Sequence, residues 1–358
     1  MKKNLQCNRG PASALLHAFL AVFLLMGVVV HAQDVPNPED DYDYQPYSYG
    51  STSGVIITAY WGQEQVVTTP TTLGGLPVIA IGPGVTRPII NLGMGPQGPS
   101  DWNPKGFSNT GVSTLTVSEG VLFIGEASLA SYSLTNVSLP ASLQDCDGNP
   151  FFGRDEPNTE LVITVAAGNA NFAVDPTSGA LIKNGTHLIF WPTHAAKAAA
   201  VDGVLTIPNG VTHIGTRVLA WNQYYDANTQ QYLFYFDSIA LPEGVTHIAD
   251  CAFYECQLQS LTLPASLTTL GLWVARTALH LPANLSSLAG HPCPDNAITV
   301  AAGNTNFHVD ESGYLLNTAG DVLYAFAHLP TRATSESQMP DTVKRIAPLA
   351  MFEEDVRA

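Results

Sequence analysis

The side chains with the clearest capacity for chemistry are two histidines that occupy the same place in a repeated pentapeptide. His213 and His247 each lie in Gly-Val-Thr-His-Ile, between a valine and an isoleucine that we expect to point inward. If these segments are adjacent strands, the rings lie about 4.8 Å apart, close enough to hold a metal or to lower each other's pKa. Phe123, Thr269 and Ser287 occupy the same place in other copies. We therefore interpret both histidines as solvent-facing positions of a repeat, and we expect no metal site.

A second candidate is the aromatic segment of residues 222–236. Two aromatic runs, Tyr224-Tyr225 and Tyr232–Phe236, flank Asp226-Ala-Asn-Thr229, which has the composition of a turn. This arrangement predicts a β-hairpin. Tyrosine anchors interfaces or stacks on sugars at low entropic cost. Our hypothesis is that four tyrosines form the main ligand contact: Tyr224, Tyr225, Tyr232 and Tyr235. The alternative is that these aromatic side chains fold back and cover the wall of the protein.

The sequence contains no pattern typical of an enzyme active site. His-Glu-x-x-His, Gly-x-Ser-x-Gly, a phosphate-binding glycine loop and Cys-x-x-Cys are all absent. The segment Asp145-Cys-Asp-Gly-Asn149 resembles the start of a calcium loop, but the remaining ligands of such a loop are missing, which favours a plain turn. We expect no catalytic residues and no cofactor.

These residues must be positioned by a repeated unit. Residues 237–253 align with residues 259–275 at a step of 22 residues. The matched positions are Ile239/Leu261, Leu241/Leu263, Pro242/Pro264, Val245/Leu267 and Ile248/Leu270. Apolar-x-apolar-Pro is a short strand with alternate side chains inward, ended by a residue that cannot donate to a ladder. One unit buries too little apolar surface to fold alone, so the units must stack as a solenoid.

The unit recurs along the chain and alternates with a larger duplication. Further copies begin near Leu115, Val137, Leu205 and Leu279, and the last spans residues 340–352. The larger duplication matches residues 163–175 with residues 298–310, both of which contain Ile-Thr-Val-Ala-Ala-Gly-Asn-x-Asn-Phe. Each copy continues through a glycine turn into two apolar strands. We therefore predict hairpin-like companion units over residues 162–195 and 297–330.

At this point the chain resembles a known family. The short unit is similar to BspA-like leucine-rich repeats in its pattern Apolar-x-Ile/Leu-Pro-x-x-Val-Thr-x-Ile-Gly-x-x-Ala-Phe. The larger duplication is similar to the companion unit of these repeats in its pattern Ala-Gly-Asn-x-Asn-Phe-x-Val-Asp-x-x-Gly-x-Leu. The resemblance covers residues 55–352. It implies a right-handed, β-rich leucine-rich-repeat solenoid, with a parallel sheet along one face and short helical or irregular turns on the other. It also implies a secreted or surface-attached protein of the kind often associated with adhesion or protein–protein contact.

The N-terminal part is expected to export and cap this stack. Residues 1–32 have a basic start, an apolar run and Val-His-Ala at the end, which predicts a cleaved signal peptide. A membrane anchor is the alternative, but the apolar core is short of the roughly 20 residues of a span. Residues 33–53, acidic and rich in Tyr and Pro, are predicted to be a flexible linker. Residues 54–112 are predicted to form a diverged capping coil with a Gly/Pro-rich excursion, and residues 113–358 the repeats.

Four cysteines follow the predicted signal peptide: Cys146, Cys251, Cys256 and Cys293. An even number in an exported chain permits disulfides. If the segment between Cys251 and Cys256 is a helical turn, their Cα atoms lie more than about 7 Å apart, too far for a bridge. Buried thiols are therefore expected for this pair, and other pairings stay open.

Charge limits the class of partner. The formal net charge is −16 and only 12% of residues are charged, which argues against nucleic acid, since that requires a basic face. We expect a secreted or cell-surface module that binds an extracellular protein or glycan through the solenoid face and the insertion 222–236, without inserting into the membrane after signal cleavage. One alternative is a structural spacer or envelope component without a specific ligand, and another is an enzyme whose site has no recognisable motif.

Overall fold

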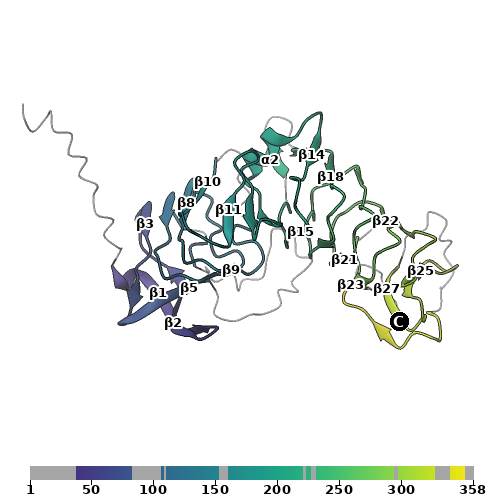
Figure 1. Ribbon diagram of the computed structural model, residues 1–358, viewed down its shortest axis with the longest axis horizontal. Coiled ribbons are helices and arrows are strands. Elements are labelled where there is room, and N and C mark those ends of the chain that lie inside the picture. Colours follow the sequence, from purple (N-terminus) through teal and green to yellow (C-terminus); the bar gives the residue numbers. More distant parts are fainter. Residues whose placement is uncertain are drawn as a thin grey trace, which may run out of the picture. The chain divides into compact units, whose positions relative to one another are not determined.

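The computed structural model describes residues 38–82, 106–108, 110–152, 160–220, 223–226, 231–293, 297–326 and 339–350. The predicted signal peptide and most of the predicted Gly/Pro-rich excursion lie outside these ranges. Within residues 37–358, which form one unit, the chain winds through successive coils (Figure 1). No helix in the described ranges is long and apolar enough to cross a membrane.

The strands that precede the repeat proline pair with one another in parallel from coil to coil. This first strand series forms three sheets, with the orders β10-β8-β6-β3, β14-β18-β20 and β22-β24. Its members are β3 (Val66–Thr68), β6 (Thr114–Thr116), β8 (Asn136–Leu139), β10 (Val162–Val165), β14 (Val204–Thr206), β18 (Ser238–Ala240), β20 (Ser260–Leu261), β22 (Leu279–Leu281) and β24 (Ile298–Val300). The registers align repeat positions, so that Ile239 lies opposite Leu261 as the 22-residue step predicts.

The Val-Thr-x-Ile part of each unit also forms a strand, and this second strand series pairs in parallel too. Its members are β5 (Leu76–Ile81), β7 (Phe123–Ile124), β9 (Asp145–Cys146), β13 (His187–Phe190), β15 (His213–Ile214), β19 (His247–Ile248), β21 (Thr269–Leu270), β23 (Ser287–Leu288), β27 (Val322–Phe326) and β28 (Arg345–Ile346). The repeat-solenoid class is confirmed. The expectation of a parallel sheet along one face is incomplete, because the coils contribute parallel strands to two faces. Among the described residues the one α-helix is α2 (Thr193–Ala199), so irregular turns make most of the other connections.

The two companion units are antiparallel insertions between parallel coils. The first consists of β11 (Phe172–Val174), β12 (Leu181–Lys183) and β13, and the second of β25 (Phe307–Val309), β26 (Tyr314–Asn317) and β27. Each then joins the next coil through a parallel pair, β13–β15 in the first unit and β27–β28 in the second.

One asparagine explains the Ala-Gly-Asn-x-Asn-Phe motif of these units. Asn169 Nδ2 donates to the carbonyls of Pro140 and Leu143 at 2.8 and 3.1 Å. Its Oδ1 accepts from the amides of Asn171 and Phe172 at 2.8 and 2.7 Å. The corresponding Asn304 makes the same four contacts in the second unit. The side chain therefore ties each companion unit to the turn of the preceding coil, and no other residue type supplies both donors and acceptors in this geometry.

The chain turns at a left-handed residue in the Ile-Gly-x-x-Ala-Phe part of each coil. Ala127, Arg217, Cys251, Trp273 and Leu349 have φ values of 57, 52, 55, 45 and 57°. Non-glycine residues rarely adopt this conformation without support. The support comes from the next coil: the Cys251 amide donates to the carbonyl of Leu272 at 2.8 Å, for example. In the Trp273 turn the residue two positions earlier must be glycine, since a Cβ on Gly271 would lie 2.5 Å from the backbone of Ala249.

The prediction that residues 33–53 form a flexible linker is wrong for the second half of this segment. Tyr42–Tyr49 form strand β1, which pairs antiparallel with β2 (Thr52–Tyr60). These two strands form the edge of the sheet that contains β5, β7 and β9. In the same sheet, β4 (Thr72–Leu73) pairs with β5. Tyr42 is 4% exposed, and its ring lies 5.2 Å from that of Tyr60. Pro46 is tolerated because β1 is an edge strand. The cap therefore begins before Gly54, and a short 3-10 turn, η1 (Glu39–Asp41), leads into it.

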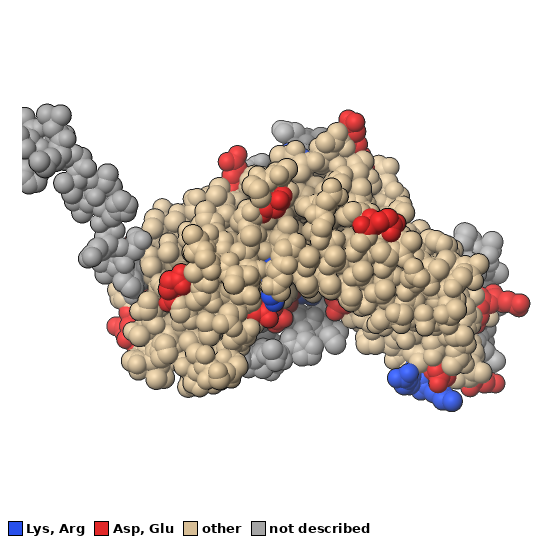
Figure 2. All heavy atoms as spheres, in the orientation of Figure 1, with Lys and Arg blue, Asp and Glu red and all other residues tan. Residues whose placement is uncertain are grey.

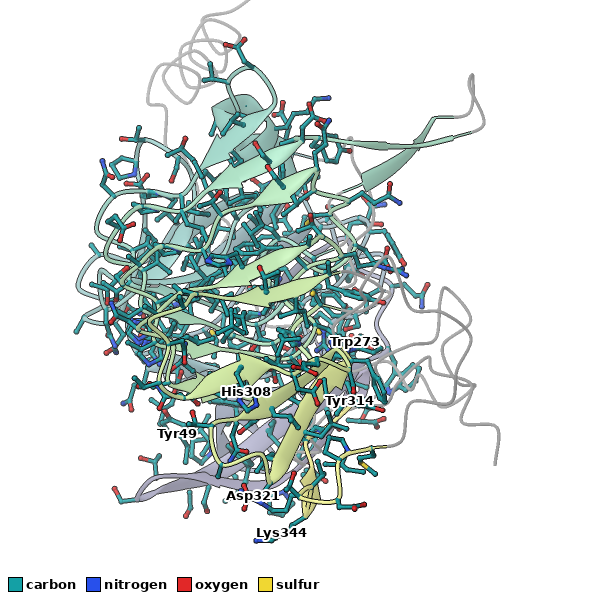
Figure 3. All side chains as sticks on the ribbon, turned by 90° about the vertical axis from the view of Figure 1, so that its right-hand side faces the viewer. Tyr49, Trp273, His308, Tyr314, Asp321 and Lys344 are labelled. Carbon is teal, nitrogen blue, oxygen red and sulfur yellow. The ribbon has the colours of Figure 1, made fainter. Side chains whose placement is uncertain are left out.

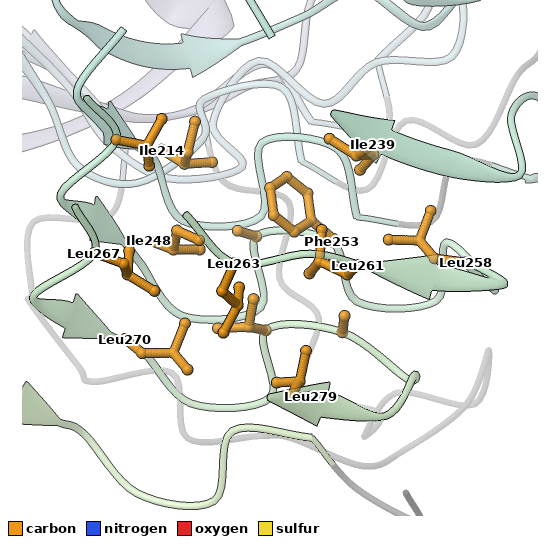
Figure 4. Packing of buried hydrophobic residues seen from close by; sticks show 14 of the residues in the cluster. Ile214, Ile239, Ile248, Phe253, Leu258, Leu261, Leu263, Leu267, Leu270 and Leu279 are labelled. Atoms are coloured by element: carbon orange, nitrogen blue, oxygen red, sulfur yellow. The ribbon is translucent and has the colours of Figure 1, made fainter. Parts of the chain in front are cut away.

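The core of the described residues consists of two large clusters, which meet at the first companion unit, and a small one around Tyr314 and Leu323. Figure 4 shows how one of them is built from equivalent positions of successive coils, such as Ile248 and Leu270. Phe172, Leu181 and Phe190 of the companion unit belong to one cluster, whereas Leu188 belongs to the other. Strand β13 thus contributes side chains to both clusters.

None of the four cysteines in the described ranges forms a disulfide. Cys251 and Cys256 are buried and unbridged, as expected. Burial raises the pKa of the Cys251 thiol to about 12, so it stays protonated at neutral pH.

Candidate functional site

The aromatic insertion forms the expected hairpin. Strand β16 (Gln223–Asp226) pairs antiparallel with β17 (Gln231–Phe234), and the register places Tyr225 opposite Tyr232 and Tyr224 opposite Leu233. Figure 3 shows the two strands extending away from the stacked coils. The structure therefore brings three of the four candidate tyrosines together on one projecting ribbon.

The fourth candidate, Tyr235, lies in the wall. It is partly buried against the larger core cluster, and Lys197 Nζ of α2 lies 5.1 Å from the centre of its ring. The next residue, Phe236, is 3% exposed. The alternative interpretation, in which the aromatic side chains cover the wall, therefore holds for Tyr235 and Phe236, which anchor the base of the hairpin.

The two candidate histidines lie in a column of three. In register, His187 of β13, His213 of β15 and His247 of β19 are direct neighbours, followed by Thr269 and Ser287. The ring centroids are 4.0 Å apart for His187 and His213, and 4.2 Å for His213 and His247, with 12° between planes in both pairs. Sequence reasoning missed His187 because it belongs to a companion unit. Its context, Gly-Thr-His-Leu, nevertheless resembles Val-Thr-His-Ile and was the available signal.

The column is partly desolvated and lies next to a cation. Desolvation by partial burial lowers the pKa of His187, and the nearby Lys183 and His247 lower it further. The pKa of His213 is lowered by the same partial burial and by both neighbouring histidines. Lys183 itself pairs with Asp145, the first residue of the segment that faintly resembled a calcium loop. Across the described ranges, no group of three or more His, Cys, Asp or Glu side chains is arranged to hold a metal ion.

The surface of the described residues has two shallow hollows large enough for a small ligand. The larger, about 440 Å³, lies over β10 and β11, and its lining runs through residues 163–166 and 172–174. The other, about 370 Å³, lies beside the β1–β2 turn and is lined in part by Tyr47 and Leu76. Neither is lined by a carboxylate, histidine or cysteine. These two hollows therefore present no carboxylate, imidazole or thiol.

The charged side chains visible on the surface are dispersed. Figure 2 shows isolated acidic side chains and few basic ones on the face in view. This distribution gives that face no basic stripe of the type that follows a nucleic-acid backbone.

The repeats match a known family. The BspA type leucine rich repeat region matches in six copies over residues 98–163 and 226–275. No curated protein sequence matches the chain significantly.

Three solved structures are similar to the chain. The pneumococcal vaccine antigen PcpA is 16% identical, with 76% of this chain and 82% of that chain covered and a TM-score of 0.32. A leucine-rich cell surface protein from Faecalibacterium prausnitzii is 17% identical, with 73% of this chain and 90% of that chain covered and a TM-score of 0.35. A leucine-rich repeat protein from Eubacterium ventriosum is 15% identical, with 69% of this chain and 78% of that chain covered and a TM-score of 0.32. The family assignment rests on the repeat itself. With six copies of that repeat and paired parallel strands in successive coils, residues 98–163 and 226–275 are BspA type leucine rich repeats.

Proposed function

We propose that the protein is an extracellular, non-enzymatic interaction module that binds a protein or glycan of its surroundings, with the hairpin β16–β17 as the main contact. Export is supported by the pattern of residues 1–32, and a role in binding by the repeat family. Proteins built of such repeats serve as binding or structural scaffolds, because stacked coils present a long surface without enclosing a cavity.

One observation carries the proposal: the hairpin leaves the strand register of the stack unchanged. The step from Leu205 to Ile239 is 34 residues, whereas that from Ile239 to Leu261 is 22. Leu205 and Ile239 are nevertheless direct partners in the parallel pair β14–β18. The additional residues therefore leave the coil and return to it without changing the register. Insertions of this kind in repeat proteins often form the binding face.

The composition of the hairpin indicates the chemistry of the contact. Three of its eight strand residues are tyrosine. Tyrosine offers a large apolar surface and a hydroxyl with few rotatable bonds, which suits both protein hot spots and sugar stacking. A net charge of −16 disfavours polyanionic partners.

The test uses residues 33–358 immobilised against a panel of purified extracellular matrix proteins and a glycan array. In one variant, residues 223–234 are replaced by a short Gly-Ser turn, which leaves Tyr235 and Phe236 in place. In a second, Tyr224, Tyr225 and Tyr232 are changed to alanine. We expect both variants to keep the wild-type Tm and to lose at least about tenfold in affinity, the size of one hot-spot contact.

A matched control is Tyr132→Ala, which removes an exposed tyrosine elsewhere (43% exposed). Undiminished binding by both hairpin variants would show that the hairpin is not the contact. A folded wild-type protein that binds no member of either panel would favour the role of structural spacer.

A further inference from the structure

The histidine column, defined as His187, His213 and His247, lies at a special place in the stack. It crosses the parallel pair β13–β15, where the antiparallel companion unit joins the regular coils. It is also the place where the two large core clusters meet, since β13 supplies Leu188 to one and Phe190 to the other. We call the pair β13–β15 the first seam.

The first seam has the same short set of backbone hydrogen bonds as the next parallel pairs of this series. The amides of Thr212 and His213 donate to the carbonyl of Thr186 at 2.9 and 3.2 Å, and the amide of Gly215 donates to Leu188 at 2.8 Å. The register extends over two residue pairs. Ring stacking between His187 and His213 adds a side-chain contact across this seam.

The hydrogen bonds of one threonine fix the state of the His247 ring. Thr246 Oγ1 donates to the carbonyl of Thr212 at 3.2 Å and lies 2.8 Å from Nδ1 of His247. A hydroxyl has one proton to donate, so Nδ1 must be the donor to Oγ1. The neutral ring then has its lone pair on Nε2. His187 and His213 have the same contact with Thr186 and Thr212, at 2.9 and 2.8 Å.

A proton taken up by any ring of the column makes that ring a cation. The next ring is then only 4.0 or 4.2 Å away, centre to centre. The charged groups around the column add to the repulsion at one end only: Lys183 of β12 lies opposite His187, with Asp145 of β9 as its partner. At the other end, β21 presents the uncharged Thr269. Among the described residues, the charged groups that act on His187 and His213 are Lys183 and the other histidines.

We propose that the histidine column is an acid-sensitive joint of the solenoid. While the imidazoles are neutral, their stacking holds the first companion unit against the following coils. In mild acid the stacked rings become a row of like charges, and the first seam loosens.

The direction of the pH dependence follows from linkage. The folded-state pKa of His187 and of His213 is lowered from 6.5, so below pH 6.5 the unfolded chain binds more protons than the folded one. The stability contributed by the column is therefore fully present above pH 6.5 and is lost as the pH falls through the folded-state pKa values.

The second companion unit supplies an internal control. Its seam, β27–β28, has the same backbone hydrogen bonds: the amides of Lys344 and Arg345 donate to the carbonyl of Asp321 at 2.9 and 3.0 Å, and the amide of Ala347 donates to the carbonyl of Leu323 at 2.8 Å. In register, however, Val322 and Arg345 replace the stacked histidines. This second seam contains no imidazole pair to protonate.

The experiment compares the full chain with His213→Thr at pH 7.5 and 5.5. Threonine occupies the same register position in β21, so the variant is compatible with the coil. Removing the middle ring separates the outer two by two strand spacings, about 9.6 Å. We expect acidification to lower the Tm of the wild type by about 2–4 °C more than that of His213→Thr. His308→Thr, which removes an exposed histidine of β25, should behave as the wild type does. His291 is buried and contributes equally to all three proteins.

Two further measurements keep the test independent of the variant. Amide exchange, corrected for intrinsic rates, should show lost protection at His213 and Gly215 at pH 5.5, with protection retained at Arg345 and Ala347 of the second seam. NMR titration should show His187 and His213 protonating below pH 6.5 with broadened curves. Independent titration of the three rings at the unshifted value, or equal acid destabilisation of wild type and His213→Thr, would overturn the proposal.

Discussion

Arg217 Nη1 lies 2.5 Å from Glu126 Oε1, although 91 residues separate the two in sequence. Both side chains are largely buried, at 10% and 13% exposed. The guanidinium also lies 4.7 Å from the ring of Phe152, and the Arg217 carbonyl accepts from Asn149 Nδ2 at 2.9 Å. The pair joins residues from either side of the first companion unit, which connects the two halves of the stack at a second place besides the first seam.

Arg217→Ala is expected to lower the free energy of unfolding by about 3–5 kcal/mol, because it leaves the Glu126 carboxylate buried without this cation. The matched control is Arg276→Ala, since Arg276 pairs with Glu255 at 2.8 Å but is 35% exposed. Solvent screening limits that loss to about 1 kcal/mol or less. Urea denaturation measures both. Similar losses in the two variants would mean that the Arg217 pair is not desolvated.

The alternation within each unit makes a second prediction. Leu263 is 8% exposed, whereas the adjacent Thr262 is exposed. Leu263→Ala should cost about 2–5 kcal/mol through lost burial and the cavity left behind. Thr262→Ala should change the free energy of unfolding by no more than about 0.5 kcal/mol. Equal effects at the two positions would contradict the inward and outward assignment.

A third prediction concerns Asn304, the asparagine that ties the second companion unit to the preceding coil. Asn304→Ala removes two donated and two accepted hydrogen bonds at a partly buried turn, and we expect a loss of about 1–3 kcal/mol. Thr305→Ala, at the exposed middle position of Asn-x-Asn, is the control and should be near neutral. Amide exchange at Asn306 and Phe307 should increase in the first variant only. Unchanged protection there would show that the motif is kept for another reason.

Much of the fold follows from the sequence because apolar spacing repeats at short range. The 22-residue step puts Ile239 opposite Leu261, and turn composition at residues 226–229 predicts the hairpin. The second strand series is harder to predict, since most of its strands contain two residues and a period of two cannot be recognised in so short a segment. Contacts between distant coils, such as Arg217 with Glu126, require the stacking order itself, which the local sequence does not contain.

The candidate site was predicted in part for the same reason. The projecting strands of the hairpin follow from local composition. The burial of Tyr235, in contrast, depends on Lys197 of α2 and on core residues of other coils. The column of histidines could be predicted only for the two members that share a repeat pentapeptide. His187 joins them through the fold of the companion unit.

The last prediction concerns strand β1, where composition was misleading. Acidic residues, proline and tyrosine are typical of flexible segments, yet Tyr42 packs against Tyr60 and Phe107, with ring centroids 5.2 and 6.4 Å apart. A bulge after Asp43 changes the register, and Tyr44 is 37% exposed. Tyr42→Ala should therefore cost about 3 kcal/mol or more, as for other buried aromatic side chains, and Tyr44→Ala about 1 kcal/mol or less. Equilibrium urea unfolding distinguishes the two. If both substitutions prove neutral, β1 contributes nothing to the cap, and the segment behaves as the linker that its composition suggests.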